Sequence, residues 1–227
     1  MSYTVLIPAA GSGTRMGRAK NKMLLELQDT AIIVHTVRRF EQDENCHAIY
    51  LATKPEERAI FLDLLSFSMK LKAIVDGGRE RQDSIRNMLE SMDACEWVMV
   101  HDGARPFVSQ EILESLYASV QVNDAVICGV RPKDTLKRVK HNMVSETIDR
   151  DYMIQVHTPQ AFRYTLLLDA YHHAYEQDLA VTDDSMMVEA RGHDVHVVQS
   201  DYNNIKITTE EDIAIGERIL RGRDDNV

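Results

Sequence analysis

A glycine-rich loop with four cationic side chains follows directly on an apolar run: residues 5–22 read VLIPAAGSGTRMGRAKNK. The apolar run has the composition of a short buried strand. Glycines let the backbone turn tightly and approach a ligand closely, and exposed backbone N–H groups in such a loop attract anions. Open α/β sheets bind ligands at the carboxyl ends of their strands. We therefore predict a phosphate site here rather than a mobile surface turn.

The glycine spacing separates this loop from two common phosphate-binding motifs. Gly11, Gly13 and Gly17 read G-x-G-x-x-x-G. A dinucleotide-binding fold needs G-x-G-x-x-G with an acidic residue about 20 positions later, and a P-loop needs G-x-x-x-x-G-K-[ST]. The loop therefore predicts neither a nicotinamide-binding fold nor a P-loop ATPase.

Composition is that of one large α/β domain, which we expect to span residues 1–227. The chain is 44% hydrophobic and 27% charged, enough for a sizeable core. Its net charge of −10 disfavours non-specific binding to nucleic acid or to an anionic membrane. We expect a cytoplasmic protein, because the three cysteines are scattered and no signal peptide or membrane-length apolar run is present.

Strands and helices are expected to alternate through the first half of the chain. Apolar runs predict strands at 5–7, 48–52, 72–75, 97–100 and 125–128, and helical periodicity predicts helices at 31–40, 55–65, 79–89 and 111–120. Short links between such elements predict a doubly wound, mostly parallel sheet. Further along, we expect helices at 164–177, 182–191 and 210–220, the last capped by Thr208 or Thr209, and strands at 195–198 and 205–207.

Between residues 131 and 156 the pattern changes. Segments 135–139 and 143–148 alternate polar and apolar residues around His141-Asn142, which predicts a β-hairpin. The hairpin has too few apolar residues to be covered on two faces, so we expect it to project as an arm at about 133–155. We expect the arm to pack on a second subunit in a homodimer; a flap over the chain's own site is the alternative.

Asp102 stands at the carboxyl end of the strand predicted at 97–100, at the sheet edge that also holds the glycine loop. A carboxylate beside a phosphate site can hold Mg²⁺, although an Asp in this position also commonly caps a turn. Arg105 adds a cation three residues later, and we interpret His101 as structural.

Two other segments offer alternatives. Gly77-Gly78 precede a predicted helix and could form a backbone-lined pocket for a base or a ribose, or simply a tight turn. Lys206 lies between Ile205 and Ile207, so it could be a solvated charge on an edge strand or a functional cation in polar surroundings.

Six motifs in order across nearly the whole chain together resemble the 2-C-methyl-D-erythritol 4-phosphate cytidylyltransferases of non-mevalonate isoprenoid synthesis. After the first loop they are HDGARPF at 101–107, KDT at 133–135, TPQ at 158–160, TDD at 182–184 and NIKIT at 204–208. The resemblance implies a Rossmann-like nucleotidyltransferase that uses CTP, a polyol phosphate and a divalent cation. Its products would be CDP-methylerythritol and pyrophosphate.

Other functions compete with this one. A ribitol 5-phosphate cytidylyltransferase would use the same chemistry on a cell-wall precursor. A non-catalytic nucleotide-binding protein would not need Lys22, Asp102 or Lys206, and all three are present. The hypothesis of a purely structural α/β domain would not explain why four cationic residues cluster in the first loop.

The resemblance also implies a role for each site residue. Arg15 and Lys22 would stabilise the five-coordinate transition state, and Asp102 would hold Mg²⁺. Arg150 and Lys206 would grip the acceptor phosphate, in a pocket lined by Arg105, Thr158 and Thr182. The nucleotide would contact Ala10, Gly11, Gly13, Gly78, Arg81 and Ser84. In this family the hairpin crosses to a partner subunit, so Arg150 would complete the neighbouring site.

Overall fold

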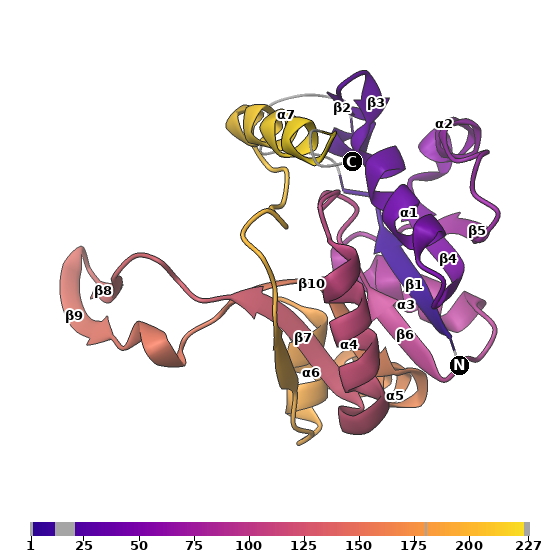
Figure 1. Cartoon of the computed structure of the whole chain (residues 1–227). Helices are drawn as coiled ribbons and strands as arrows, with labels where there is room; N and C mark the ends of the chain where they lie inside the picture. The colour runs from indigo at the N-terminus through magenta and orange to yellow at the C-terminus, as the bar shows by residue number, and fades with distance from the viewer. Residues whose placement is uncertain (1, 12–20, 180, 225–227) are drawn as a thin grey trace.

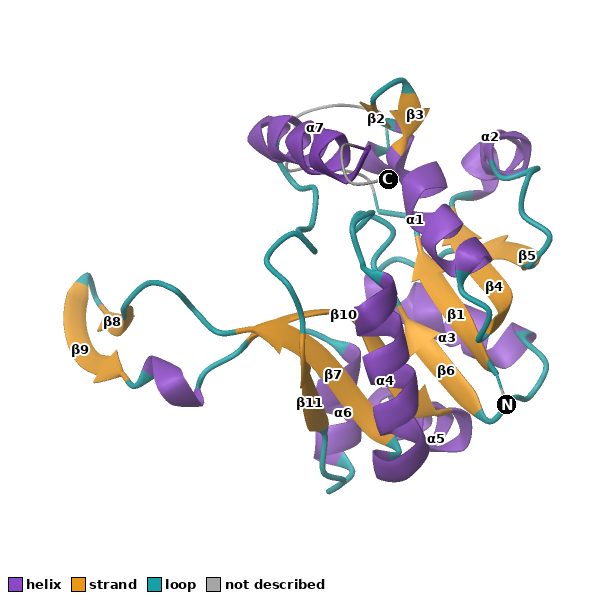
Figure 2. Ribbon diagram, in the orientation of Figure 1, coloured by secondary structure: helices purple, strands orange, loops and turns teal. Residues whose placement is uncertain are grey.

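A seven-stranded sheet forms the centre of the structure, with strand order β11-β7-β10-β6-β1-β4-β5 (Figures 1 and 2). The computed structural model describes residues 2–11, 21–179 and 181–224. The strands are β1 (Tyr3–Pro8), β4 (Cys46–Thr53), β5 (Leu71–Asp76), β6 (Trp97–Val100), β7 (Ala125–Val130), β10 (Gln155–Arg163) and β11 (His196–Gln199). Only β10 runs antiparallel to its neighbours. The predicted doubly wound, mostly parallel sheet is therefore confirmed.

Helices cover both faces of this sheet, because successive residues of a strand point to opposite faces. Val5 and Ile7 of β1 join one hydrophobic cluster, whereas Leu6 between them joins the other. The first cluster includes side chains of α1 (Ile32–Gln42), α2 (Arg58–Leu64) and α4 (Gln110–Asn123), and the second those of α3 (Arg81–Ser91), α5 (Tyr164–Glu176) and α6 (Asp184–Ala190). None of the helices in the described ranges has the length and apolar character needed to cross a bilayer.

A smaller cluster lies at the end of the sheet where α7 (Glu210–Asp224) crosses the short hairpin of β2 (Glu26–Leu27) and β3 (Thr30–Ala31) (Figure 1). The predicted cap of α7 is confirmed at Thr209. Its Oγ1 accepts a bond from the Asp212 backbone N at 3.3 Å, and the Asp212 carboxylate accepts one from the Thr209 N at 2.8 Å. This reciprocal pair satisfies backbone donors that the first helical turn leaves open.

β10 is the central strand that the sequence pattern does not predict. It reads QVHTPQAFR, and a proline argues against a central strand because it cannot donate to the ladder. The pairing register with β7 shifts between His157 and Gln160, so Pro159 lies in the irregular stretch. From Gln160 onward the strand pairs with both β6 and β7.

The predicted strand at 205–207 is wrong. These residues form an extended loop that pairs with no strand of the described sheet, and β11 remains the edge strand. The alternation that suggested a strand has another cause: Ile207 is fully buried in the cluster beneath α7, while Lys206 lines a cavity on the other side. The other predicted strands and helices all coincide with elements of the structure.

The predicted hairpin is confirmed as β8 (Leu136–Lys140) and β9 (Met143–Ile148), which project from the sheet as an arm (Figures 1 and 2). His141 and Asn142 have φ values of 50° and 62°, as the two central residues of a type I′ turn require. Val139, Met143 and Val144 on this arm are 57%, 68% and 62% exposed. The described part of the chain therefore leaves the apolar residues of its own arm largely uncovered.

We expect Phe162→Ala to lower the free energy of unfolding by about 3–5 kcal/mol, because the ring is fully buried on β10. Val122→Ala on α4 is the control: that side chain is 81% exposed, so the change should stay below about 0.5 kcal/mol. Urea denaturation measures both. Equally small effects would contradict the central position of β10.

Candidate functional site

A cavity of about 150 Å³ opens at the carboxyl ends of β1, β5 and β6. Several predicted site residues share its wall: Ala10, Gly11, Lys22, Gly78, Arg81, Ser84, Asp102 and Lys206. They come from five separate segments of the chain, which the parallel strands bring to one edge of the sheet. Arg15 and Gly13 lie outside the described residues.

Lys22 is held at the cavity by its neighbour Asn21. The buried Asn21 amide donates to the Ala9 carbonyl at 2.8 Å and to the Glu57 carboxylate at 2.7 Å, and its Oδ1 accepts from the Met23 backbone N at 3.0 Å. Asn21 thereby caps the 3₁₀ turn η2 (Lys22–Leu24) and ties it to the end of β1. Asn21 belongs to the first sequence motif, but the motif alone does not predict this capping role; the signal for it is a polar residue directly before a turn.

The glycine pair after β5 serves as both a turn and a wall. A side chain at Gly77 would meet the Ala10 Cβ at 2.2 Å, so the first loop and this turn pack too closely for any other residue. The Gly78 N donates to the Ser84 hydroxyl at 3.1 Å, and Glu80 heads a capping box that starts α3. The tight turn before the helix is therefore confirmed, and Gly78 also lines the cavity; that this wall contacts a base or a ribose stays a prediction.

Asp102 is the charged centre of the cavity wall. Its carboxylate accepts from Lys206 Nζ at 2.6 Å and from Arg81 Nε at 2.9 Å, and Arg105 Nε lies 3.9 Å away. Burial would raise the pKa of Asp102, but the three cations outweigh it and hold that pKa well below its usual range. Lys206 is therefore half of a part-buried ion pair at the cavity rather than a solvated edge charge.

Arg81 bridges Asp102 to a second carboxylate. Its Nη2 donates to Asp184 at 2.8 Å, and the Asp184 carboxylate also accepts from the Tyr171 hydroxyl at 2.6 Å. Burial lowers the pKa of Arg81, but the two carboxylates raise it by more, so the guanidinium stays charged. Asp184 and Tyr171 were not among the predicted site residues. Asp184 belongs to the TDD motif at 182–184, but the spacing of the motif does not predict which of its side chains is buried.

Arg105 and Thr158 support Asp102 from behind the cavity. The Thr158 hydroxyl accepts from the Asp102 backbone N at 2.9 Å. Arg105 Nη1 donates to the Asn204 carbonyl at 2.8 Å, and the buried Asn204 amide donates to the Thr158 carbonyl at 3.0 Å. These bonds tie the loop that carries Asp102 to the loop that carries Lys206.

Besides Arg105 and Thr158, two more predicted site residues do not line this cavity. Thr182 is exposed and lines a neighbouring hollow of about 60 Å³, beside Arg81 and Asp184. Arg150 is exposed in the 3₁₀ turn η4 (Arg150–Tyr152) at the base of the arm, where it donates to the Lys133 carbonyl. The arm extends away from the rest of the chain (Figure 1). One chain alone therefore does not bring Arg150 to Asp102.

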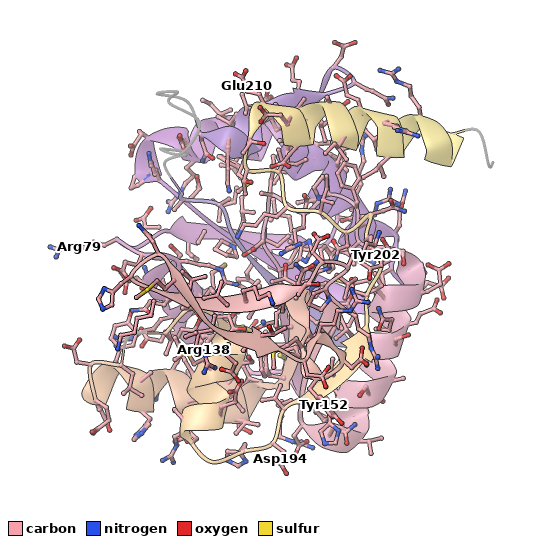
Figure 3. The ribbon with its side chains drawn as sticks, turned by 90° about the vertical axis from the view of Figure 1, so that its left-hand side faces the viewer. Arg79, Arg138, Tyr152, Asp194, Tyr202 and Glu210 are labelled. Carbon is pink, nitrogen blue, oxygen red and sulfur yellow. The ribbon has the colours of Figure 1, made fainter. Side chains whose placement is uncertain are left out.

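Figure 3 views the molecule from the side on which the arm projects. Arg138 and Tyr152, both on the arm, stand in front of the sheet, and the side chain of Arg79 points away from the ribbon (Figure 3). Arg79 also lines the cavity. A cation at its rim adds to the attraction for an anionic ligand.

His101 has the structural role that the sequence predicted. It is fully buried and packs edge-on against Phe40 with ring centroids 5.0 Å apart. Its Nε2–H donates to the Arg105 carbonyl at 3.0 Å, and its Nδ1 accepts from the Thr158 hydroxyl at 3.2 Å. Burial lowers the pKa of His101 to about 4.

Comparisons with known proteins identify the family. The family model described as 2-C-methyl-D-erythritol 4-phosphate cytidylyltransferase (IspD) matches residues 3–222. The chain belongs to this family. A relative of that name from Lysinibacillus sphaericus is 45% identical over 225 residues, which cover 98% of this chain and 97% of the relative. One from Bacillus cereus is 44% identical over 221 residues, 96% of this chain and 98% of the relative.

Solved structures agree with this family. The 4-diphosphocytidyl-2C-methyl-D-erythritol synthase of Anaerococcus prevotii superposes with a TM-score of 0.87 at 32% identity, covering 97% of this chain and 96% of that one. The 2-C-methyl-D-erythritol 4-phosphate cytidylyltransferase of Francisella tularensis gives 0.82 at 30% identity, with 96% and 99% covered. The expected Rossmann-like nucleotidyltransferase fold is confirmed, and the chain is an enzyme of this class.

The stability of the enzyme should fall as the pH is lowered from about 6.5 to about 4, by up to about 3 kcal/mol from His101. In this range the unfolded chain binds a proton at His101, whereas the folded ring stays neutral down to about pH 4. Urea denaturation at about pH 7, 6 and 5 measures the slope. His101→Gln should remove only the share of His101 and leave that of His157, whose pKa burial also lowers to about 4. His172→Gln, at an exposed site on α5, should keep the full slope. An unchanged slope in His101→Gln would contradict this origin.

Proposed function

We propose that this cavity is where the chain transfers a cytidylyl group from CTP to 2-C-methyl-D-erythritol 4-phosphate, giving CDP-methylerythritol and pyrophosphate. The observation that carries the proposal is the meeting of Lys22, Arg81 and Lys206 at one cavity beside the glycine loop, in a chain of the family named for this reaction. The matched relatives carry the name of the methylerythritol phosphate enzyme, so the ribitol phosphate alternative is not favoured.

The reaction requires two anions to meet. An oxygen of the acceptor phosphate attacks the α-phosphorus of CTP in line, a new P–O bond forms, and the bond to the β-phosphate breaks as pyrophosphate leaves. The protein's task is to orient both phosphates and to neutralise their charge. Lys22, held by Asn21, lies on the cavity wall for this purpose. The matching role of Arg15 rests on the family resemblance alone.

We also propose that Asp102 holds a divalent cation such as Mg²⁺ when CTP is bound. Among the described residues, no three His, Cys, Asp or Glu side chains gather into a metal site, so phosphate oxygens would supply the other ligands, as is usual for Mg²⁺ with nucleotides. The anionic carboxylate of Asp102 fits this use. Bound there, the ion would withdraw charge from the phosphates. Lys206 has a flexible side chain and could exchange Asp102 for the acceptor phosphate.

The arm supports a further proposal, that two copies of the chain form a homodimer. Its apolar residues are exposed, and Tyr152 beside Arg150 is 84% exposed. Clustered exposed apolar residues mark contact surfaces. Docking of the arm on a second copy would cover them and would carry Arg150 to the neighbouring cavity, where it would grip the acceptor phosphate.

We place the enzyme in the cytoplasm as part of the same proposal. Cys46, Cys95 and Cys128 are all free thiols, and unpaired cysteines are typical of a reducing compartment. Burial raises the pKa of Cys46 and of Cys128 to about 12, so neither thiol ionises at neutral pH.

Pyrophosphate release from CTP and Mg²⁺ tests the reaction, with methylerythritol phosphate and ribitol phosphate offered separately. We expect turnover with the first acceptor. Lys22→Ala should lower kcat by about 10³-fold with little change in KM, because it removes charge stabilisation felt mainly in the transition state. Lys72→Ala, at an exposed position on the edge strand β5, is the control and should keep full activity. Preference for ribitol phosphate, or no pyrophosphate, would refute the proposed reaction.

Mixing two inactive variants tests whether subunits share a site. Arg150→Ala should raise the KM for the acceptor, and Lys22→Ala should lower kcat, so at an acceptor concentration far below the raised KM each variant alone should show little activity. After random reassociation, half the dimers would be mixed and each would hold one intact site, so about a quarter of wild-type activity should return. Each variant reassociated with itself is the control. No recovery in the mixture would show that each site is made within one chain.

A further inference from the structure

A line of paired side chains runs from the cavity into the helices behind it. Asp102 at the end of β6 meets Arg81 of α3, Arg81 meets Asp184 of α6, and Asp184 meets Tyr171 of α5. Asp184 and Tyr171 are fully buried, whereas the Arg81 side chain is 31% exposed at the cavity. The line therefore connects a ligand-facing cation to two residues that no ligand in the cavity would touch.

Asp184 determines how the Arg81 guanidinium lies. The group is planar and rigid, so holding two of its nitrogens fixes the orientation of the plane. Nη2 is held by Asp184 at 2.8 Å and Nε by Asp102 at 2.9 Å. The Tyr171 hydroxyl, at 2.6 Å, occupies the other oxygen of Asp184 and keeps the carboxylate from turning. Without Asp184, a single bond to Asp102 would leave the guanidinium free to rotate.

The charge of Asp184 also matters at the cavity. Arg81, Lys206 and Arg105 all surround Asp102. Asp184 is the second carboxylate in contact with this group and halves its surplus positive charge from two units to one. Arg81 is then shared between two anions instead of being held by Asp102 alone. Asp102 thus remains better able to exchange its partners when a nucleotide and its cation arrive.

We infer that Asp184, supported by Tyr171, is a positioning residue that orients Arg81 for nucleotide binding. The inference rests on the proposed use of the cavity for CTP. The competing role is structural: Asp184 would only fasten α6 to α5, and the nucleotide would be indifferent to it. A structural role changes thermal stability alone, whereas a positioning role changes CTP affinity in protein that remains folded.

The test measures the dissociation constant for CTP by calorimetry, with Mg²⁺ and without acceptor. Asp184→Asn should weaken CTP binding by about tenfold or more, and Tyr171→Phe, which keeps the carboxylate, by about two- to fivefold. Asp169→Asn is the matched control: it breaks the ion pair between Asp169 of α5 and Arg191, the residue directly after α6, which lies away from the cavity. It should leave CTP affinity unchanged.

The outcomes separate the inference from the proposed function. Wild-type protein that fails to bind CTP would overturn the proposed function and the inference together. Wild-type binding with unchanged affinity in folded Asp184→Asn would overturn only the inference. If Asp184→Asn does not fold, Tyr171→Phe decides, and an unchanged dissociation constant in that variant would overturn the inference.

A double-mutant cycle tests whether Asp184 acts through Arg81. In an Arg81→Ala background, Asp184→Asn should weaken CTP binding by less than about twofold, because the group it positions is already gone. A full tenfold loss in that background would show that Asp184 acts independently of Arg81, and the inference would fail.

Discussion

The site depends on one buried carboxylate, Asp102, whose charge is stabilised by neighbouring cations instead of by water. Asp102 is buried at the end of β6 and stays anionic because Arg81, Lys206 and Arg105 surround it. A buried charge without such partners is costly, and two of the three cations are held in turn by a further group. Asp184 holds Arg81, and the Asn204 carbonyl holds Arg105. The conformations of two loops and two helices therefore depend on this one anion.

This arrangement suits a reaction between phosphates. A site of fixed positive charge needs a counter-anion while empty, and Asp102 provides it. The cations are therefore already in place before the substrates bind, which is the basis of electrostatic preorganisation.

The arm differs from the sheet in how its apolar residues are covered. The core of the sheet is covered on both faces by helices of the same chain. Among the described strands, β8 and β9 pair only with each other, and they keep Val144 and Met143 exposed. An isolated two-stranded hairpin has little independent stability in water. Its geometry is set locally by the turn at His141-Asn142, whereas its stability in the functional enzyme depends on what covers its apolar residues.

Most of the fold could be predicted from local patterns. The alternation of apolar runs with helical periodicity predicted the mostly parallel sheet, and the glycine loop at the end of β1 predicted the edge at which the cavity lies. The motif resemblance identified the family and named most of the residues that line the cavity. β10 was not predicted because a proline such as Pro159 is unusual in a central strand. In the structure Pro159 lies where the pairing register shifts, and the strand pairs with both neighbours from Gln160 onward.

The sequence by itself determined most of the helices and strands, the turn at Gly77-Gly78 and the identity of the charged groups, because these depend on residues a few positions apart. The tertiary structure decided which charges meet. Arg81 and Lys206 stand 21 and 104 positions from Asp102 in the chain, and Asp184 turns inward while Thr182 of the same motif remains exposed. Ion pairs across such separations are set by how the helices pack on the sheet, and no local pattern records that packing.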